Sequence, residues 1–112
     1  MLFRSLLTRH VRDRGDLTVE QAVHKMTGQL AGLFGFAGRG VLAEGAAGDL
    51  VVFNLDELDW ATDVFVADLP EGARRLRRPP GGYRYTAVGG TVVQAGGALT
   101  GARPGTVLRP GR

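Results

Sequence analysis

Cysteine is absent from this chain of 112 residues, which also has only one lysine, one serine and two histidines. Without cysteine, no disulfide framework or thiolate metal site is expected, and the composition fits a reducing compartment such as the cytoplasm. The single serine, Ser5, lies outside any nucleophile-elbow motif, which argues against a Ser-His-Asp hydrolase. Two histidines leave few ligands for a catalytic zinc, which usually takes three protein ligands. The sequence therefore offers no obvious catalytic centre.

Long hydrophobic runs are also missing. The apolar start of the chain is broken by Arg4, Arg9 and His10 before it reaches the roughly 7 to 15 residues that the core of a signal peptide requires. No segment approaches the ~20 apolar residues of a membrane span. A chain of this size forms at most one domain and buries roughly two-thirds of its unfolded surface. We therefore expect a soluble chain with one modest core and no membrane partner.

Charges of one sign are missing from two long segments. Residues 40–73 contain eight acidic residues and no base, whereas residues 74–112 contain eight arginines and no acid. The basic segment allows an alternative function, nucleic-acid binding through residues 74–84, which predicts an affinity that falls steeply with salt. No RNP, KH or zinc-finger motif accompanies these arginines. We therefore expect the acidic and basic blocks to face each other, or a partner domain, rather than nucleic acid.

An amphipathic helix is predicted over residues 2–14, because apolar residues recur there at spacings of three and four. Gly15 would end this helix as a C-cap glycine does. The predicted apolar stripe consists of Leu2, Phe3, Leu6, Leu7, His10 and Val11. The opposite face carries Arg4, Arg9, Arg12 and Asp13. His10 is expected to be packed and hydrogen-bonded.

A second helix is predicted to start at Thr18, which forms a capping box with Gln21 three residues later. Its predicted buried face consists of Val19, Ala22, Val23 and Met26. Gly28 is expected to stop it, and a short helical turn through Leu30, Ala31, Leu33 and Phe34 then ends at Gly35. These signals predict a helical first third of the chain.

Strand signals follow from Val41 onward. We predict a short strand at Val41–Leu42, a turn at Glu44–Gly45, and a strand at residues 50–53 that is covered on both faces. Residues 54–72 are expected to be irregular. A hairpin with a two-residue turn at Gly89–Gly90 is predicted for residues 83–88 and 91–95, followed by an extended tail. The fold class is therefore predicted to be α+β with a mostly antiparallel β segment.

Other possible sites have simpler structural explanations. Glu20 and His24 are four residues apart on a helix, which favours a surface pair over a metal site. The acidic residues Asp56, Glu57 and Asp59 are typical of a polar loop after a strand, although such pairs also serve as acid and base. The glycine-rich residues 35–40 follow a helix and precede a strand, which is the reverse of a phosphate-binding loop. We therefore predict no catalytic, cofactor-binding or metal-binding residue.

Four motifs carry a resemblance to a known family. They are LTVEQAVHKMTG at residues 17–28, GFAGRGVLAEGAAGDLVVFN at residues 35–54, DLPEGARRLRRPPGGYRY at residues 68–85, and TGARPG at residues 100–105. Together they closely resemble the C-terminal part of the amidohydrolase superfamily. The second motif is common to many amidohydrolases. The arginine-rich stretch and TGARPG narrow the resemblance to the N-acyl-D-amino-acid deacylases, also called D-aminoacylases.

The resemblance implies a fold and a division of the chain. Residues 1–36 would be the last helical part of a TIM-barrel enzyme, and residues 37–112 would be the β segment of a composite β-sandwich. A full-length relative would hydrolyse an N-acyl amide with zinc, whose ligands include a His-x-His pair that this sequence lacks. The chain alone is therefore expected to be inactive and to have a structural role. Its expected partner is the missing barrel portion or an upstream-encoded barrel polypeptide, with self-association through uncovered apolar surfaces.

Overall fold

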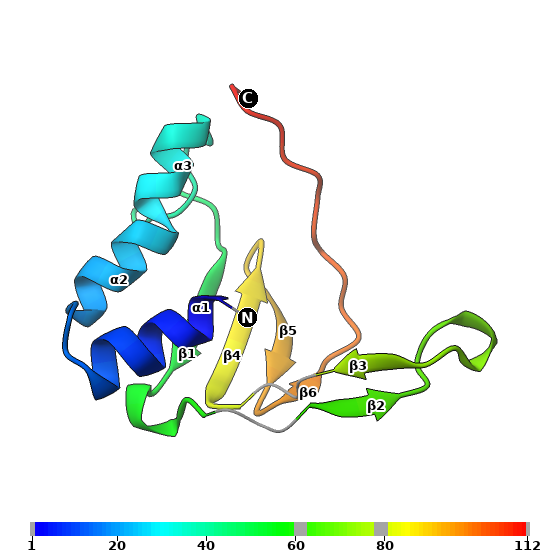
Figure 1. The fold of residues 1–112 in the computed structure, drawn as a ribbon. Coiled ribbons are helices and arrows are strands. Elements are labelled where there is room, and N and C mark those ends of the chain that lie inside the picture. Colours follow the sequence, from blue (N-terminus) through cyan, green and yellow to red (C-terminus); the bar gives the residue numbers. More distant parts are fainter. Residues whose placement is uncertain (1, 60–62, 78–80, 112) are drawn as a thin grey trace.

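The structure is a computed structural model that describes residues 2–59, 63–77 and 81–111 (Figure 1). The helical elements come first: α1 (Leu2–Ser5), the π-helix η1 (Leu6–Asp13), α2 (Val19–Met26) and α3 (Gly28–Phe34). The strands follow: β1 (Leu50–Phe53), β2 (Val64–Val66), β3 (Arg75–Arg77), β4 (Tyr83–Val88), β5 (Thr91–Ala95) and β6 (Ala98–Leu99). Two short 3₁₀ turns, η2 (Leu55–Glu57) and η3 (Pro70–Gly72), lie between strands. The predicted α+β class is confirmed. No helix in the described ranges has the length and hydropathy needed to cross a membrane.

The first predicted helix is present, but most of it is wound as a π-helix. Arg14 N–H donates to Arg9 C=O at 2.9 Å, a bond between residues five apart. Within the predicted apolar stripe, Leu7 is buried, and Leu6 and Val11 pack partly buried against the core. The side chains of Leu2 and Phe3 lie outside the described part of the chain. Leu6, Leu7 and Val11 of the predicted stripe therefore face the core.

The predicted outer face of this helix is wrong for two arginines. Arg4 is only 7% exposed, and its Nη1 donates to Asp59 C=O at 2.9 Å. Arg12 Nη1 donates to Leu55 C=O at 3.2 Å and also to Leu58 C=O. Arg12 lies in the π-helix, whose wider turn shifts the faces relative to a period of 3.6 residues, whereas Arg4 lies in α1 just before it. Both side chains reach the loop after β1. They join the helices to the β segment.

His10 lies at the margin of this stripe. Its Nδ1 is 3.1 Å from Asp16 Oδ2, so the expected hydrogen bond is confirmed. The side chain is still 41% exposed, however, and the packed environment predicted for it is wrong. The π winding of η1, which contains His10, shifts this residue away from the face predicted with a period of 3.6 residues.

The start of α2 agrees with its predicted capping box. Gln21 N–H donates to Thr18 Oγ1 at 3.1 Å, and Thr18 N–H donates to Gln21 Oε1 at 3.0 Å. The end differs from the prediction, because α2 stops at Met26 and Gly28 begins α3 instead of ending the helix. The break is at Thr27, whose backbone has φ −125° and ψ −84°, and whose hydroxyl donates to Val23 C=O at 2.6 Å. Gly35, with φ +73°, ends α3 as predicted.

The passage from α3 to the sheet contains the predicted turn but not the predicted strand. Ala46 N–H donates to Ala43 C=O at 3.1 Å, which confirms the turn at Glu44–Gly45. Val41 and Leu42 form a bend and are 52% and 83% exposed. A strand requires a neighbour for its backbone groups, and within the described residues none pairs with this dipeptide.

The main sheet has the strand order β1-β4-β5-β6, and all of its pairs are antiparallel. The β4–β5 hairpin is confirmed, with Gly89 and Gly90 at φ +57° and +80° in a two-residue turn that requires positive φ at both positions. A second glycine turn leads into β6. The residues of this strand were predicted to belong to the extended tail. The remaining tail is extended and runs back to α3, where Gly111 N–H donates to Gly35 C=O at 3.0 Å (Figure 1).

The strand β1 is paired on one side only and is not covered on its faces. Leu50, Val51 and Val52 are 40%, 46% and 43% exposed, so the prediction of a strand buried on both faces is wrong for this chain. Its unbroken apolar run is typical of a strand with protein packed against both of its faces. The described residues supply no second sheet over β1, and the core lies toward one end of the strand.

The segment 54–72, predicted to be irregular, contains a strand, β2, which forms a two-stranded ribbon with β3 just beyond that segment. Strands β2 and β3 pair with each other and form a separate sheet. The apolar run Val64-Phe65-Val66 is the feature of the sequence that indicates the first of these strands. Its partner strand alternates arginine with leucine, and its two arginines belong to the basic segment 74–112.

The core is small and joins the helices to the loop after β1. Its fully or nearly buried members are Leu7 of η1, Ala22 of α2 and Leu58, which are 3%, 0% and 0% exposed. Around them pack the partly buried residues Leu6, Val11, Leu17, Val23, Met26, Phe53, Leu55 and Tyr83. The helical and β segments therefore share one core. The domain boundary between residues 36 and 37 remains a prediction.

Candidate functional site

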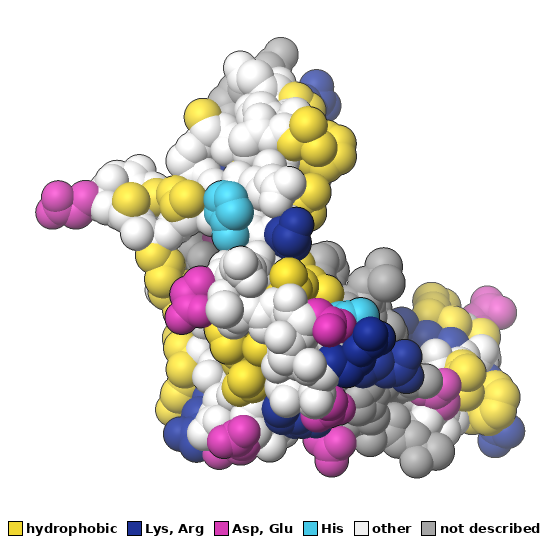
Figure 2. All heavy atoms as spheres, turned by 60° about the vertical axis from the view of Figure 1, so that its left-hand side comes forward, with side chains coloured by type: hydrophobic (Ala, Val, Ile, Leu, Met, Phe, Trp, Pro, Cys, Tyr) yellow, Lys and Arg dark blue, Asp and Glu magenta, His cyan; other side chains and the backbone are white. Residues whose placement is uncertain are grey.

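The two histidines do not form part of a metal site. Figure 2 shows their side chains (cyan) in separate places on the surface. Asp16 binds both His10 and Arg14, each at 3.1 Å, while His24 is exposed on α2 and makes no ion pair with Glu20 among the described residues. Across residues 2–59, 63–77 and 81–111, no three His, Cys, Asp or Glu side chains come together as metal ligands would. The donor set of this chain therefore does not fit a zinc centre.

The acidic loop after β1 is occupied by structural contacts. Glu57 accepts two hydrogen bonds from Arg84, at 2.6 and 3.1 Å, and this interaction lowers the pKa of the Glu57 carboxyl. A carboxylate held in its ionised form does not act as a proton donor near neutral pH. Asp56 N–H donates to the Asn54 side chain at 3.0 Å, and Asp59 C=O accepts from Arg4. Ser5 occupies the N-cap position of η1, where its side chain makes no capping hydrogen bond.

Acidic and basic blocks pair within the chain, as expected. Besides Glu57 and Arg84, Asp68 accepts two hydrogen bonds of 2.7 Å from Arg75. Both pairs join the acidic segment 40–73 to the basic segment 74–112. Arg78 and Arg112, also counted in the basic block, lie outside the described residues. Two of the arginines proposed to bind phosphate are therefore held by carboxylates, and the nucleic-acid alternative gains no support.

The glycine-rich passage after α3 is a close-packed junction of backbones. Gly40 has φ +75°, and a Cβ atom there would lie 2.7 Å from Thr27 C=O. Gly48 is similar, because its Cβ would lie 2.8 Å from the amide nitrogen of Gly90. Next to it, the Asp49 carboxylate accepts from Gly89 N–H at 2.9 Å and pairs with Arg39. The passage therefore connects α3 to the β4–β5 turn through close backbone packing and the contacts of Asp49.

We expect Asp49→Asn to weaken the pH dependence of stability. Gly89 N–H, followed by Arg39, lowers the pKa of Asp49 below its usual 3.8, so the ionised group stabilises the fold above that value. This stabilisation is lost as the pH falls through the lowered pKa. The effect is under about 1 kcal/mol, because both side chains are partly exposed. Urea unfolding at pH 7 and pH 2.5 measures it, with Glu44→Gln as control. Equal pH dependence in both variants would contradict the assignment.

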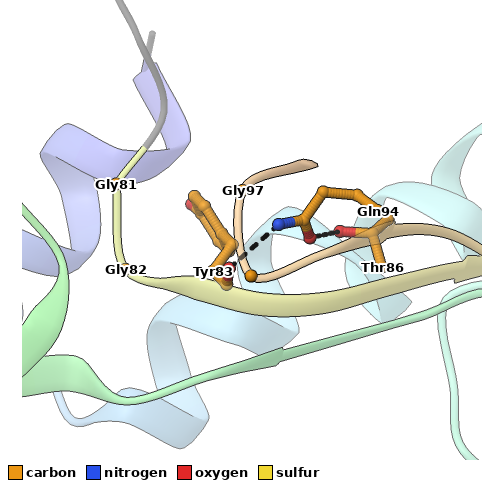
Figure 3. A pocket seen from close by; sticks show the side chains of 7 residues that line it. Gly81, Gly82, Tyr83, Thr86, Gln94 and Gly97 are labelled. Atoms are coloured by element: carbon orange, nitrogen blue, oxygen red, sulfur yellow. Dashed lines mark hydrogen bonds between the residues drawn. The ribbon is translucent and has the colours of Figure 1, made fainter. Parts of the chain in front are cut away.

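One hollow lies at the end of β4 and β5 (Figure 3). It has a volume of about 210 Å³ and is lined by Gly81, Gly82, Tyr83, Thr86, Gln94, Gly96 and Gly97. The Gln94 side chain donates to Tyr83 C=O at 3.1 Å, and Thr86 Oγ1 donates to Gln94 Oε1 at 3.3 Å. Ligand pockets usually exceed about 300 Å³ and combine apolar walls with perturbed ionisable groups. This hollow is smaller, and it is lined mainly by glycines and by the hydrogen-bonded Gln94 side chain.

An uncovered apolar face of the main sheet is the first of two prominent surfaces. Residues directly opposite one another in antiparallel strands share a face, so the register defines two rows. These rows are Leu50–Ala87–Val92 and Val52–Tyr85–Ala95–Ala98. We call them the apolar sheet face. Four of its members, Leu50, Val52, Tyr85 and Val92, are 40–51% exposed. An open groove of about 480 Å³ extends from Val52 to Val19 at the start of α2.

The second surface lies on α3. Leu30, Leu33 and Phe34 are spaced as one helical stripe and are 38%, 75% and 57% exposed; we call them the α3 stripe. Figure 2 shows hydrophobic side chains (yellow) on the outside of the molecule at the level of this helix. Large apolar surfaces of this kind mark sites of contact with other protein. The most prominent surface features of the described residues are therefore these two exposed apolar surfaces.

Known proteins resemble this chain along nearly its whole length. A model of the amidohydrolase family matches residues 2–94. The N-acyl-D-aspartate deacylase of Alcaligenes xylosoxydans xylosoxydans is 34% identical over 109 residues, 97% of this chain and 20% of that protein. The D-aminoacylase of the same organism is 39% identical over 106 residues, 95% of this chain and 20% of that protein. A solved structure of D-aminoacylase, concerned with its binuclear metal center, superposes with a TM-score of 0.69 and 34% identity, over 89% of this chain and 19% of that one.

These similarities confirm the resemblance seen in the motifs, down to the D-aminoacylase branch. The chain spans about one fifth of the length of these relatives, which fits the predicted C-terminal part of such a protein. The related D-aminoacylase has a binuclear metal center, whereas the described residues of this chain bring no comparable ligands together. The chain therefore belongs to the amidohydrolase family, where it corresponds to about a fifth of a D-aminoacylase-like protein.

Proposed function

We propose that this chain is the non-catalytic C-terminal portion of an N-acyl-D-amino-acid deacylase-like enzyme. The observation that carries the proposal is the pair of uncovered apolar surfaces, the apolar sheet face and the α3 stripe. Relatives five times longer contain the polypeptide that such surfaces require as a cover. In the whole enzyme, the helices would complete the barrel, and the main sheet would complete a β-sandwich.

The chemistry of the whole enzyme would be hydrolysis of an N-acyl amide to an amino acid and a carboxylate. Zinc would belong to the part of the enzyme outside this chain, since His10 and His24 do not meet in one site. This chain would therefore act on the reaction only by holding the catalytic part in shape. The absence of cysteine supports a cytoplasmic location.

The partner would be the barrel, either in the same polypeptide or encoded separately upstream. Both arrangements bury the same surfaces, because covalent continuity does not change which faces are apolar. Without a barrel, the apolar sheet face and the α3 stripe would lead copies of this chain to associate with one another.

A chimeric enzyme tests the proposal. We expect the D-aminoacylase of Alcaligenes xylosoxydans xylosoxydans to keep deacylase activity when this chain replaces its matching fifth. Activity within about 100-fold of the parent is expected, because a displacement of 1 Å at a catalytic site costs about that much. The parent lacking this fifth should be inactive. The measurement is hydrolysis of N-acetyl-D-amino acids, with metal content determined on the same samples.

Two variants of the chimera locate the contact. Val52→Asp places a charge on the apolar sheet face and should abolish folding or activity, whereas Val107→Asp changes a tail residue that is 88% exposed and should do neither. Turnover by the isolated 112-residue chain would overturn the structural role. A folded, metal-loaded chimera without activity would equally count against it.

A further inference from the structure

The β2–β3 ribbon projects from the rest of the molecule (Figure 1). Phe65 lies directly opposite Leu76, so both side chains stand on one face of the ribbon, where they are 74% and 56% exposed. We call this pair the ribbon face. On the other face, Val64 and Val66 lie opposite Arg77 and Arg75, respectively. The aliphatic stems of arginines cover apolar neighbours in part in such pairs, and Val64 is 41% exposed, so the ribbon face is the more exposed of the two.

The ribbon is held in shape before anything binds to it. Asp68 and Arg75 form a two-bonded ion pair beside the turn that joins the strands. Within that turn, Glu71 and Gly72 have φ of +61° and +72°, a left-handed conformation that reverses the chain sharply. A preformed surface binds with less loss of conformational entropy than a flexible one. The ribbon is therefore suited to dock against a partner.

The two edges of the ribbon also differ, because only one of its strands carries charged residues. Strand β3 carries Arg75 and Arg77, and charged residues on an edge strand discourage pairing with another strand. Strand β2 is Val-Phe-Val and has no charge. A two-stranded ribbon is marginally stable in water by itself and persists when its apolar side packs on other protein. Within the described residues, neither its apolar face nor its uncharged edge has a cover.

We infer that the ribbon is a docking arm, whose Phe65–Leu76 face packs against the part of the amidohydrolase outside this chain. The match to the N-acyl-D-aspartate deacylase includes 109 of the 112 residues, so it spans the ribbon. That relative carries about four times as much further polypeptide. The inference rests on the proposed function and adds a contact separate from the apolar sheet face and the α3 stripe.

Hydrogen exchange in the chimera described above tests the arm. The amides of β2 and β3 should exchange at least about tenfold more slowly in the chimera than in the isolated chain, because docking adds protection. The double variant Phe65→Ser, Leu76→Ser should remove this protection. Val64→Ser, on the opposite ribbon face, is the matched control and should keep it. The deacylase assay is run on every sample.

Three results would overturn the docking arm. An active chimera whose ribbon exchanges as fast as in the isolated chain would refute the arm and leave the proposed function standing. Protection in the isolated chain that rises with its concentration would assign the ribbon face to a second copy. A chimera that neither folds nor hydrolyses substrate would refute the proposed function, and the docking arm with it.

Discussion

Gly82→Ala is expected to destabilise the chain by at least about 3 kcal/mol, a large part of the 5–15 kcal/mol that stabilises a typical domain. Gly82 has φ +85°, where a side chain is strained. A Cβ atom at this position would lie 2.5 Å from Glu57 C=O and 2.6 Å from Leu58 Cα. These are backbone atoms of the loop that carries a core residue, so relief requires moving that loop. The free energy of unfolding in urea gives the measurement.

The preceding glycine provides a matched control. Among the described residues, a Cβ atom on Gly81 would meet nothing closer than Asp59 C=O at 3.8 Å, which is an ordinary contact, and its φ is not left-handed. Gly81→Ala should therefore change stability by less than about 1 kcal/mol. If the two alanine variants unfold at the same urea concentration, the loop is not packed against Gly82 as described.

Leu58→Ala should cost about 2–5 kcal/mol, the usual range for removing a fully buried leucine from a core. Leu58 is 0% exposed and lies with Leu7 and Ala22 where the helices meet the β segment. The side chain comes from a loop, and its neighbours in η1, α2 and β1 belong to hydrogen-bonded elements that relax only partly into a cavity. Thermal unfolding followed by circular dichroism measures the loss, and both helical and strand signals should fall together.

Leu99→Ala is the corresponding control on the surface. Leu99 is 82% exposed on β6, so its truncation should change stability by no more than about 0.5 kcal/mol. A loss for Leu58→Ala no larger than that for Leu99→Ala would place the core elsewhere. Separate melting of helices and strands in the Leu58 variant would show that they do not share a core.

Features fixed by neighbouring residues were predictable from the sequence. Thr18 and Gln21 satisfy each other's backbone N–H groups over three residues, and this capping box forms whatever packs on the helix. The hairpin turn at Gly89–Gly90 is equally local, since only its own backbone twist must suit the flanking strands. The family resemblance likewise rests on contiguous motifs.

Features set by distant residues were not predictable. Arg4 and Arg12 turn inward because carbonyl groups some 40 to 55 residues later accept their hydrogen bonds, and no local period reports such partners. The burial of β1 was overestimated because an unbroken apolar run predicts a covering layer on each face, and the described residues do not supply both layers. The β2–β3 ribbon was missed because three-residue strands are too short for a periodic signal.

The shared core has a consequence for how this sequence can be inherited. Leu58 and Phe53 belong to the β segment by position, yet they pack with Leu7 and Ala22 of the helices. Arg4 and Arg12 reach across the same junction. A recombination event near residue 36 would combine two halves of one core from different parents, and their side chains would not have been selected to fit. Helices and sheet should therefore pass between relatives as one block.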